Sequence, residues 1–360
     1  MTFDTLIVGA GPAGCAAAAR LARDGAKAVL VHRPSANQRH SESLPGAATR
    51  ALAGAGLDPI DNVIEGRCGG TLSAWGSDEL VVSDAFAAPD GPGWWIDRNR
   101  FDSELRHCCV GLGVALLTGR LRDLRRRGRG WIAGTAAGAD ISARWVIDAT
   151  GRTAAVARRL GAVRRTGPAL VAVHARTTTP REQPPARIFL EAEADGWWYV
   201  GASSQRRISA VAVIDPGDAR RLRCQEHFVT RLGALPNLGG FAGAATDWSA
   251  PQVSPAGGAW LDTVCGQGWI ACGDAALAFD PLSSQGLLGA LASGVAAARA
   301  ITSGNPCASL TGIEARHKDI LAAYDARRYA AYAREQRWAR RPFWSSQIGR
   351  RSPETVSSMA

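Results

Sequence analysis

The chain has 360 residues, 46% apolar and 21% charged, which is enough to bury a core divided between two lobes. No apolar run approaches the length of a membrane span and no basic-then-apolar leader is present, so we expect neither a membrane protein nor a secreted one. The eight cysteines lack CxxC or Cys/His ligand spacing. This argues against a zinc site and favours reduced thiols in a cytoplasmic protein.

The net charge of +10 is carried almost wholly by arginine, because Lys27 and Lys318 are the only lysines. The densest basic run, "GRLRDLRRRGRGW" (Gly119–Trp131), lies between two strand-like runs and predicts a hairpin connection. Such runs usually serve solubility, and the alternative is a docking surface for an acidic peptide or protein. No zinc-finger, helix-turn-helix or RNP pattern accompanies the charge, so no nucleic acid is expected as a partner.

The first 34 residues alternate as strand, tight turn, helix and strand. Thr5–Val8 is β-branched and apolar, an alanine-rich helix ends near Asp24, and Ala28–Val31 predicts a second strand. This βαβ context makes the intervening Gly-x-Gly-x-x-Gly a dinucleotide-binding turn rather than a chance match.

The turn contains Gly9, Gly11, Ala13 and Gly14. The first glycine permits the tight bend, the second lets backbone approach a pyrophosphate, and the third lets helix pack on strand. The helix N-terminus then offers free N–H groups and a positive dipole end to the phosphates.

The second strand departs from the usual pattern at its end. A carboxylate normally stands there to bind the ribose hydroxyls, but this chain has His32 followed by Arg33. A neutral imidazole can accept a hydrogen bond from a hydroxyl. Alternatively, Arg33 contacts the adenine or the ribose.

A second cofactor segment returns near residue 270. FAD is longer than one mononucleotide half can hold, so another segment must reach its ribityl chain and ring. Trp269–Cys272 predicts a strand, and the residues after it that we assign to the flavin are Gly273, Asp274, Pro281, Gly286 and Leu287. Asp274 would accept from a ribityl hydroxyl, and the helix start at Gly286 would stabilise negative charge on reduced flavin. The alternative is a buried aspartate that caps a helix.

A third segment, "WVIDATGRTAAVARRLG" (Trp145–Gly161), supplies a strand with Asp148, Gly151 and Arg152. The three segments together predict that the chain closes around one FAD from both ends.

These motifs resemble those of the para-hydroxybenzoate hydroxylase superfamily of flavoprotein monooxygenases, where they occur in this order. The resemblance implies an α/β fold, with a Rossmann-like FAD-binding lobe, an inserted antiparallel β-sheet substrate domain and C-terminal helices. "WWIDRNRFDSEL" (Trp94–Leu105) looks like the arginine-bearing segment of that family, which implies that Arg98 touches the flavin or the pyrophosphate. Arg50 stands where such enzymes carry another flavin-contacting arginine. For either arginine, an interhelical salt bridge is the alternative.

Several shorter stretches are more specific. They are Ser41–Leu52, Leu72–Ser77, Gly93–Asp102, Gly196–Val200, Phe279–Gly286 and Arg334–Trp344. Taken in order they resemble the LodB/GoxB/QhpG-like flavoproteins, which are related to tryptophan halogenases. That group acts on peptide-bound tryptophan while a tryptophan-derived quinone cofactor is made in another protein.

The chain lacks three features of the halogenase relatives. No lysine occurs between Lys27 and Lys318, the WxWxIP pattern is replaced by Gly196–Gly201, and Ser283 stands where halogenases have a carboxylate. Hydroxylation of an indole ring through a flavin C4a-hydroperoxide is therefore the leading hypothesis. The ring must be held close to the reactive oxygen with water excluded.

The implied co-substrates are O2 and NADH or NADPH, or a partner flavin reductase as electron source. The implied substrate is a tryptophan-containing peptide or protein, which the basic run would suit if it were acidic. The alternatives are a reductase of an isoprenoid-like substrate, a tryptophan halogenase, and an assembly factor that carries flavin without chemistry.

The residues expected at the substrate are aromatic or titratable. Trp75, Trp95, Trp198 and Tyr199 are assigned to a substrate wall, although for any one tryptophan core packing is the alternative. His40 and Glu42 are the close titratable pair assigned to proton transfer, before an expected helix start, although ordinary helix capping at Ser41 or Ser43 is the alternative for this segment. Tyr199 would hydrogen-bond the substrate.

The expected organisation is discontinuous. "ARIFLEAE", "GWWYVGAS" and "RISAVAVID" alternate as adjacent strands should, and residues 313–340 predict a helix. The predicted parts are an FAD-binding domain from 1–65, 98–165 and 262–305, a substrate-binding domain from 66–97 and 166–261, and a C-terminal helical segment from 306–350.

Overall fold

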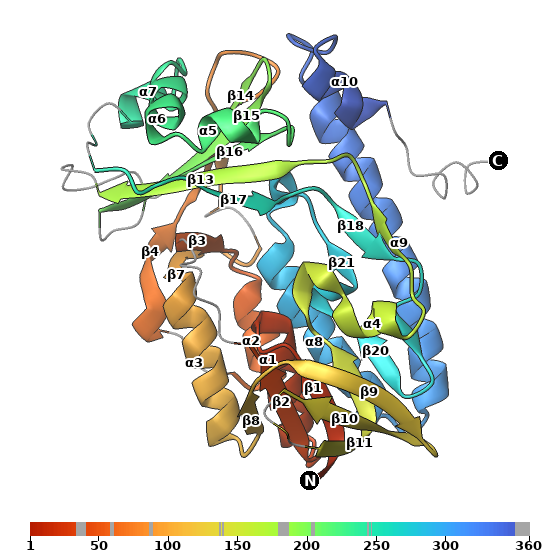
Figure 1. Ribbon diagram of the computed structural model, residues 1–360. Coiled ribbons are helices and arrows are strands. Elements are labelled where there is room, and N and C mark those ends of the chain that lie inside the picture. Colours follow the sequence, from red (N-terminus) through yellow and green to blue (C-terminus); the bar gives the residue numbers. More distant parts are fainter. Residues whose placement is uncertain are drawn as a thin grey trace.

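The computed structural model describes residues 1–33, 41–57, 61–85, 89–136, 138, 140–178, 187–202, 206–242, 245 and 247–349. A largely parallel sheet lies in the lower half of Figure 1, and an antiparallel sheet crosses the upper half. The two halves are joined by short strands and by the long helix α9 (Pro306–Ala333) along one side.

The lower sheet has eight strands, in the order β19-β20-β11-β1-β2-β8, with β10 and then β9 added next to β11. Its strands are β1 Thr2–Val8, β2 Ala28–His32, β8 Ala115–Thr118, β9 Leu121–Arg127, β10 Gly130–Thr135, β11 Asp140–Asp148, β19 Cys265–Gly266 and β20 Trp269–Ala271. The strands from β20 to β8 run parallel, which is the arrangement that the βαβ pattern predicts.

Both faces of the parallel strands are buried, because neighbouring apolar residues point to opposite sides. Ile7 and Leu30 pack on the helices, whereas Leu6 and Val29 pack on the β9–β10 hairpin and α4 (Ala155–Arg159). Hence these strands are almost continuously apolar.

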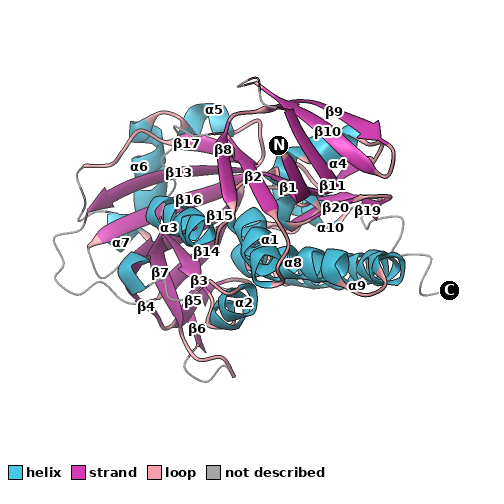
Figure 2. Cartoon of the chain, turned by 90° about the horizontal axis from the view of Figure 1, so that it is seen from below, coloured by secondary structure: helices cyan, strands magenta, loops and turns pink. Residues whose placement is uncertain are grey.

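The helices on the first face are α1 Pro12–Arg23, α2 Ala48–Ala55, α3 Arg98–Gly111 and α8 Gly286–Thr302. Figure 2 shows α1, α8 and α9 side by side. Small residues let α8 approach α1 closely, since a Cβ built on Gly294 would lie 2.2 Å from the carbonyl oxygen of Ala13. The alanine and glycine content of both helices is thus a packing requirement.

The upper sheet has seven strands in the order β17-β13-β16-β15-β14-β5-β6. They are β5 Gly70–Ala74, β6 Val81–Asp84, β13 Val171–Thr178, β14 Ile188–Glu193, β15 Gly196–Ala202, β16 Arg207–Ile214 and β17 Gln252–Pro255. The predicted adjacency of β14, β15 and β16 is confirmed, with antiparallel pairing throughout. Only β14 and β5 pair in parallel among these described strands.

This sheet also has two different faces. One carries Trp198 and Ala210 against the helices α5 Ala219–Leu222, α6 Gln225–Gly233 and α7 Gly239–Ala242. The other carries Trp197 and Val211 against residues of α9 and α10 (Pro342–Ile348). We call this second side the aromatic face.

Two three-stranded sheets connect the halves. One has the order β3-β7-β4 and the other β12-β18-β21. Their bounds are β3 Ser41–Leu44, β4 Ile64–Cys68, β7 Gly93–Asp97, β12 Arg164–Thr166, β18 Ala259–Leu261 and β21 Leu277–Ala278. Short 3-10 helices lie at Asp61–Val63, Gly151–Thr153, Gly273–Ala275 and Pro281–Ser283.

Two local expectations were wrong. The basic run is not a connection, because Leu121–Arg127 is itself strand β9 and only a tight turn joins it to β10. The last long helix covers Pro306–Ala333 rather than 313–340, since Pro306 and the cap at Asn305 start it earlier. The helix start expected after Glu42 is confirmed, because Glu42 lies in β3 and α2 begins at Ala48, just beyond Pro45.

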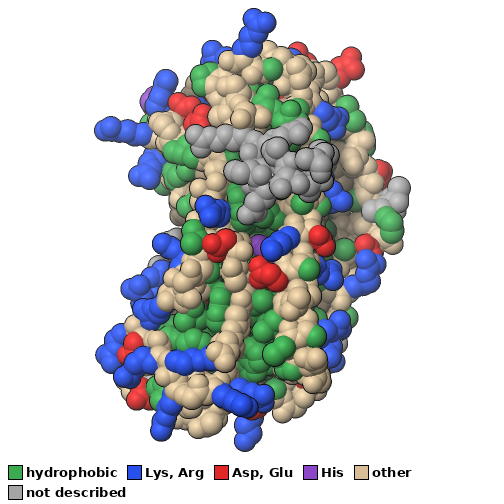
Figure 3. Space-filling model, turned by 90° about the vertical axis from the view of Figure 1, so that its right-hand side faces the viewer, with side chains coloured by type: hydrophobic (Ala, Val, Ile, Leu, Met, Phe, Trp, Pro, Cys, Tyr) green, Lys and Arg blue, Asp and Glu red, His purple; other side chains and the backbone are tan. Residues whose placement is uncertain are grey.

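The parallel sheet takes its strands from 2–32, 115–148 and 265–271, and the seven-stranded sheet takes its strands from 70–84 and 171–255. The proposed domain boundaries remain a prediction. Figure 3 shows Lys and Arg side chains spread over the side on which α9 lies. Within the described residues, no helix has both the length and the apolar character that crossing a membrane would need.

Candidate functional site

The glycines of the first turn differ in what surrounds them. A Cβ on Gly9, which has φ +111°, would lie 2.1 Å from the carbonyl oxygen of Ala149, and one on Gly14 would lie 1.9 Å from that of Gly9. Both positions therefore require glycine, because neighbouring backbone atoms leave no room for a Cβ. A Cβ on Gly11 meets nothing within 4 Å.

The open space at Gly11 lies at the start of α1. Gly11 is the N-cap in extended conformation, and no side chain of the described residues caps the helix. The first N–H groups of α1 are therefore without a capping side chain among those residues, and negative charge is favoured beside them. A glycine with no described atom within 4 Å of its Cβ position fits the close approach of a pyrophosphate.

The start of α8 has the same character. In the described part of the chain, Gln285 is the N-cap without a side-chain hydrogen bond, and a Cβ on Gly286 would meet no atom within 4 Å. Pro281 begins the preceding 3-10 turn, while Leu287 is buried in the core and anchors the helix. Two uncapped helix starts on neighbouring helices fit the phosphates and the ring of one FAD.

Three arginines surround Asp274, of which Arg152 and Arg164 are the nearest. Arg152 Nε lies 3.8 Å from the Asp274 carboxylate and Arg152 also donates to the carbonyl of Gly257 at 2.6 Å. Arg164 donates to the backbone carbonyls of Asp274 and Ala275 at 2.8 and 2.7 Å. Burial raises the pKa of Asp274, against the effect of these arginines, and yet 39% of its side chain is exposed. The carboxylate is therefore held in place but accessible, as a hydroxyl-binding group must be.

Arg98 begins α3 and is largely buried between two carboxylates. It donates to Glu42 at 2.6 Å and to Asp102 at 3.2 Å. Burial opposes its charge, but the two carboxylates outweigh that effect and raise the pKa of Arg98. Its Nε has no partner among the described residues. Arg98 also acts on the pKa of Asp274, so it lies within electrostatic reach of the flavin segment.

Tyr199 joins this group from the aromatic face. Burial raises the pKa of its hydroxyl, and the charge of Glu42 raises it further. Glu42 also acts on the pKa of Asp274. Glu42 and Tyr199 are 157 positions apart in the sequence, yet the fold brings Glu42, Arg98, Tyr199 and Asp274 into one electrostatic cluster between the two halves.

Comparison with known proteins agrees with this geometry. The family model of the lycopene cyclase protein matches residues 4–176. LodB of Marinomonas mediterranea, which carries the name of an FAD-dependent oxidoreductase, is 25% identical over 359 residues and covers 95% of this chain and 96% of its own length. This chain is an FAD-dependent oxidoreductase similar to LodB.

Two solved structures establish the fold of this flavoprotein. The peptidyl tryptophan dihydroxylase QhpG, described as essential for tryptophylquinone cofactor biogenesis, superposes with a TM-score of 0.77 at 22% identity, over 96% of this chain and 79% of QhpG. The myxobacterial chondrochloren halogenase CndH superposes with a TM-score of 0.85 at 21% identity, over 99% of this chain and 88% of CndH. The fold class and the resemblance predicted from the motifs are confirmed.

The adenosine end of the flavoprotein site keeps its unusual histidine. His32 Nε2 lies 3.4 Å from the hydroxyl of Thr118 on the neighbouring strand. Burial and the charge of Arg106 lower the pKa of His32, which favours the neutral imidazole. Arg33 is exposed beside it. A neutral His32 can accept a hydrogen bond from a ribose hydroxyl, so the sequence hypothesis for this position stays a prediction.

Asp148 has a different task from the one expected. Its Oδ1 accepts from the backbone N–H and the hydroxyl of Thr150, and its Oδ2 accepts from the N–H groups of Val156 and Ala157. Four protein donors thus occupy the carboxylate, which fixes the turn containing Gly151, at φ +67°. Asp148 orders the segment beside the first glycine turn rather than offering an oxygen to a ligand.

Two of the residues assigned from sequence, Arg50 and Trp198, lie away from the cluster around Glu42. Arg50 is exposed and pairs with Asp90 on the surface. Trp198 lies on the opposite side of its sheet from the aromatic face, fully buried against Phe228 of α6. The structure therefore separates both residues from the cluster around Glu42.

Trp75 and Trp95 both pack against strand β15, which carries Tyr199. Trp75 belongs to the aromatic face, where its indole N–H donates to the carbonyl of Ala331 at 2.8 Å. Trp95 is 4% exposed, its Nε1 has no partner among the described residues, and its ring covers Gly201 of β15. His40 lies outside the described residues.

The sequence analysis missed Arg106 and Arg164. Arg106 lies eight positions after Arg98 on α3, and its guanidinium is 3.5 Å from the carbonyl of Ala10. That spacing leaves the two side chains about 80° apart around the helix, so no local pattern indicates Arg106. Arg164 lies on a short strand with no motif around it, so only the tertiary structure reveals its hold on the Asp274 turn.

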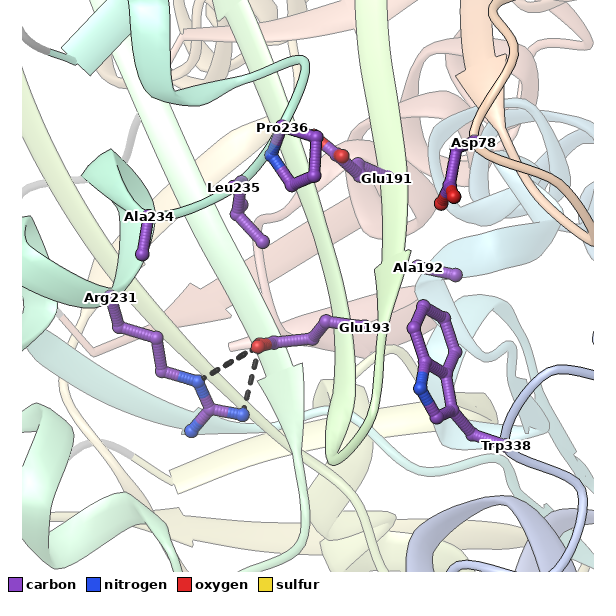
Figure 4. Close-up of a pocket in the computed structure, with 9 residues that line it drawn as sticks. All are labelled: Asp78, Glu191, Ala192, Glu193, Arg231, Ala234, Leu235, Pro236 and Trp338. Carbon is purple, nitrogen blue, oxygen red and sulfur yellow. Dashed lines mark hydrogen bonds and ion pairs between the residues drawn. The ribbon is translucent and has the colours of Figure 1, made fainter.

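A separate cavity of about 210 Å³ lies beside β14, lined by Arg231 and Leu235 on one side and by Asp78 and Trp338 on the other (Figure 4). Its charged groups are already paired. Arg231 binds Glu193, Asp78 pairs with Arg337, and Glu191 accepts from the backbone N–H groups of Asn237 and Leu238. Among the described residues that line the cavity, no charged group lacks a partner.

Proposed function

We propose that this flavoprotein is a monooxygenase that places oxygen from O2 on an indole ring, in a tryptophan of a peptide or protein. The observation that carries the proposal is the cluster of Glu42, Arg98, Tyr199 and Asp274, which joins the flavin segments to an aromatic-lined sheet. QhpG is described as acting on peptidyl tryptophan, and its fold supports the same substrate class here.

The chain's own residues would divide the work. The N–H groups at the starts of α1 and α8 would bind the phosphates and the ring of FAD, and Asp274 would accept from its ribityl chain. Reduced FAD together with O2 would supply an electrophilic oxygen to the substrate ring. Since an indole is electron-rich, it needs orientation and exclusion of water more than it needs a base.

Glu42 and Tyr199 are the residues that we assign to the substrate. The ion pair with Arg98 fixes the Glu42 carboxylate, of which 43% stays exposed. Like any tyrosine, Tyr199 is protonated at neutral pH, and burial raises its pKa further, so its hydroxyl can donate to a substrate carbonyl or to Glu42. Both residues would hold the indole in place, and Glu42 would accept the proton released from the ring.

An electron donor and a protein partner would also be needed. NADH, NADPH or a separate flavin reductase would reduce the flavin in the cytoplasm. The exposed arginines of β9, among them Arg122, Arg125 and Arg127, would suit an acidic substrate protein or reductase.

Halogenation is the second candidate, because the fold of CndH superposes closely. Against it, the chain has no lysine between Lys27 and Lys318 that could hold an activated halogen near the flavin. Direct transfer of oxygen needs no such residue.

The test is mass spectrometry of tryptophan-containing peptides after incubation with the protein, FAD, NADH and 18O2, with bromide added in a parallel reaction. We expect a mass gain that carries heavy oxygen. Tyr199→Phe should lower its rate about 10-fold, corresponding to one lost hydrogen bond to substrate. Tyr329→Phe, on α9, is the matched control and should keep the wild-type rate.

Two results would contradict the proposal. A brominated peptide would show that the missing lysine does not prevent halogenation. An unmodified peptide, despite bound FAD that NADH reduces, would favour a different substrate and the reductase alternative.

A further inference from the structure

Asp280 lies in the loop that leads from the Asp274 turn to the start of α8, and it is 2% exposed. Its Oδ1 accepts from the N–H of Leu282 at 2.8 Å, and its Oδ2 accepts from the hydroxyl of Tyr332 at 2.9 Å. Its own N–H donates to the hydroxyl of Tyr324 at 3.0 Å. Both tyrosines lie on α9, so two phenol groups attach this loop to a helix that begins after the FAD segments end.

The hydrogen bonds continue into the seven-stranded sheet. The indole N–H of Trp197, on β15, donates to the hydroxyl of Tyr332 at 3.1 Å. Trp197 and Tyr332 are both almost fully buried. The ring of Trp197 is 5.9 Å from that of Tyr199, between centroids. A continuous path, Trp197 to Tyr332 to Asp280, therefore runs from beside the proposed substrate residue to the loop before Gly286.

The carboxylate of Asp280 depends on this path. Burial raises its pKa, while the donors and the more distant charges of Arg328 and Arg152 favour the ionised form. The guanidinium of Arg328 lies 5.5 Å from the ring of Tyr332 and is held by Gln347. A buried carboxylate is costly when a donor is removed, so the donors determine where it lies.

A capping role alone does not account for these contacts. Capping of the 3-10 turn at Pro281–Ser283 needs only the bond from the Leu282 N–H to Oδ1. The second oxygen instead engages Tyr332, and Tyr332 in turn engages the aromatic face. These bonds fix the loop relative to the sheet, not merely within itself.

We propose that Asp280 and Tyr332 are positioning residues, which align the 281–286 loop and the start of α8 with Tyr199 on the aromatic face. The inference rests on the proposed function in so far as this helix start holds the flavin ring and Tyr199 the substrate. Neither residue would touch a reacting atom. Their effect passes through Trp197 on one side and the loop backbone on the other.

The first test needs no cofactor and no substrate. Amide hydrogen exchange is measured on the apoprotein of wild type, Tyr332→Phe and the matched control Tyr329→Phe. We expect exchange in residues 280–286 to become about 10-fold faster in Tyr332→Phe only, because the carboxylate loses its phenol donor. Equal acceleration throughout the chain, or no change in 280–286, would overturn the proposal.

A double-mutant cycle adds a second measurement. Asp280→Asn leaves one acceptor oxygen where the aspartate has two, so we expect amide exchange in the loop to become about 3-fold faster. If the two residues act through their bond, Asp280→Asn combined with Tyr332→Phe should be less than multiplicative. Multiplicative effects would contradict the coupling. Asp280→Asn also provides the loop measurement if Tyr332→Phe does not fold.

The FAD-loaded proteins then connect the loop to the flavin. Tyr332→Phe should shift the visible absorption bands of bound FAD and lower its affinity about 3- to 10-fold, whereas Tyr329→Phe should change neither. An unchanged spectrum and affinity would contradict alignment of the flavin segment. None of these readouts depends on oxygen transfer, so failure of the monooxygenase proposal and failure of this one are distinguishable.

Discussion

The first glycine turn and strand β15 use neighbouring residues in opposite ways. In the turn, Gly9, Gly11 and Gly14 act through backbone, and what matters is how much room each one leaves. On β15, the consecutive residues Trp197 and Trp198 have the same side chain but point to opposite faces of the sheet. Trp197 belongs to the hydrogen-bonded path to Asp280, whereas Trp198 lies in the core that packs against α6.

Local sequence is therefore more informative about a backbone turn than about the role of a side chain on a strand. A backbone turn is determined over a few residues, so its motif can be recognised without knowledge of the rest of the chain. The role of a side chain on a strand depends on which layer covers each face, and that layer comes from distant segments.

The largest expected effect is a contrast between Gly14 and Gly11, because replacing the first should reduce stability and replacing the second should reduce FAD affinity. Gly14→Ala should destabilise the protein by about 3 kcal/mol or more, because its Cβ would lie 1.9 Å from a backbone oxygen that cannot move aside. Gly11→Ala should change apoprotein stability by no more than about 1 kcal/mol. Its FAD affinity should nevertheless fall at least about 10-fold, since the methyl group fills the space for the pyrophosphate.

Thermal unfolding of the apoproteins and fluorescence titration with FAD measure the two effects. Wild-type affinity in Gly11→Ala would remove the argument that this open space receives the cofactor. Normal stability in Gly14→Ala would show that the two backbones can separate.

A loss of stability of similar size is expected on β15. Trp198→Ala should cost about 3–5 kcal/mol, because the indole is fully buried against Phe228. Tyr199→Phe should cost no more than about 1 kcal/mol, since it removes only a hydroxyl. Urea unfolding of both variants makes the comparison. If Trp198→Ala kept normal stability but lost peptide oxidation, Trp198 would return to the substrate site.

The smallest effect concerns Asp274 and pH. Its folded-state pKa is raised, so the folded protein binds this proton more tightly than the unfolded chain does. The stability that it contributes therefore falls as pH rises from its ordinary unfolded pKa through the raised folded pKa. Asp274→Asn removes this penalty at neutral pH and changes nothing well below the ordinary pKa.

We expect the Tm of apo Asp274→Asn to rise by only about 1–2 °C at pH 7, because solvent screens a side chain that is 39% exposed. The Tm at about pH 3 should not change. FAD affinity at pH 7 should fall, since a hydroxyl-accepting carboxylate is lost. Asp319→Asn, at an exposed position of α9, is the matched control. A lower Tm at pH 7 in Asp274→Asn would contradict the sign.

Much of the flavin lobe could be predicted from sequence. The strands around Thr5–Val8 and Ala28–Val31, the helix between them and the helix from Gly286 all appear within a few residues of their predicted ends. Each carries its own local signal, an apolar run or a glycine at a turn. The basic run failed as a predicted connection because the strand is largely exposed and carries three consecutive arginines, Arg125 to Arg127, so it lacks the alternation of apolar and polar residues that would have indicated a strand.

The candidate site was predicted less evenly. Asp274 and Arg98 were found through motifs, and the structure brings both near Glu42 and Tyr199. Asp148 was expected at the cofactor because it follows a strand in a flavoprotein motif. Four backbone and hydroxyl donors that only folding brings to it explain why it orders a turn instead.

The glycine turn after β1, the helix that starts at Gly286 and the antiparallel strands β14 to β16 could be recognised in the sequence, because each depends on spacing over a few residues. Only the tertiary structure shows which face of β15 packs on α9, which arginine binds the backbone at Asp274, and that Asp280 accepts a hydrogen bond from Tyr332. Those outcomes depend on packing between segments more than 50 residues apart, whose mutual placement no local pattern encodes.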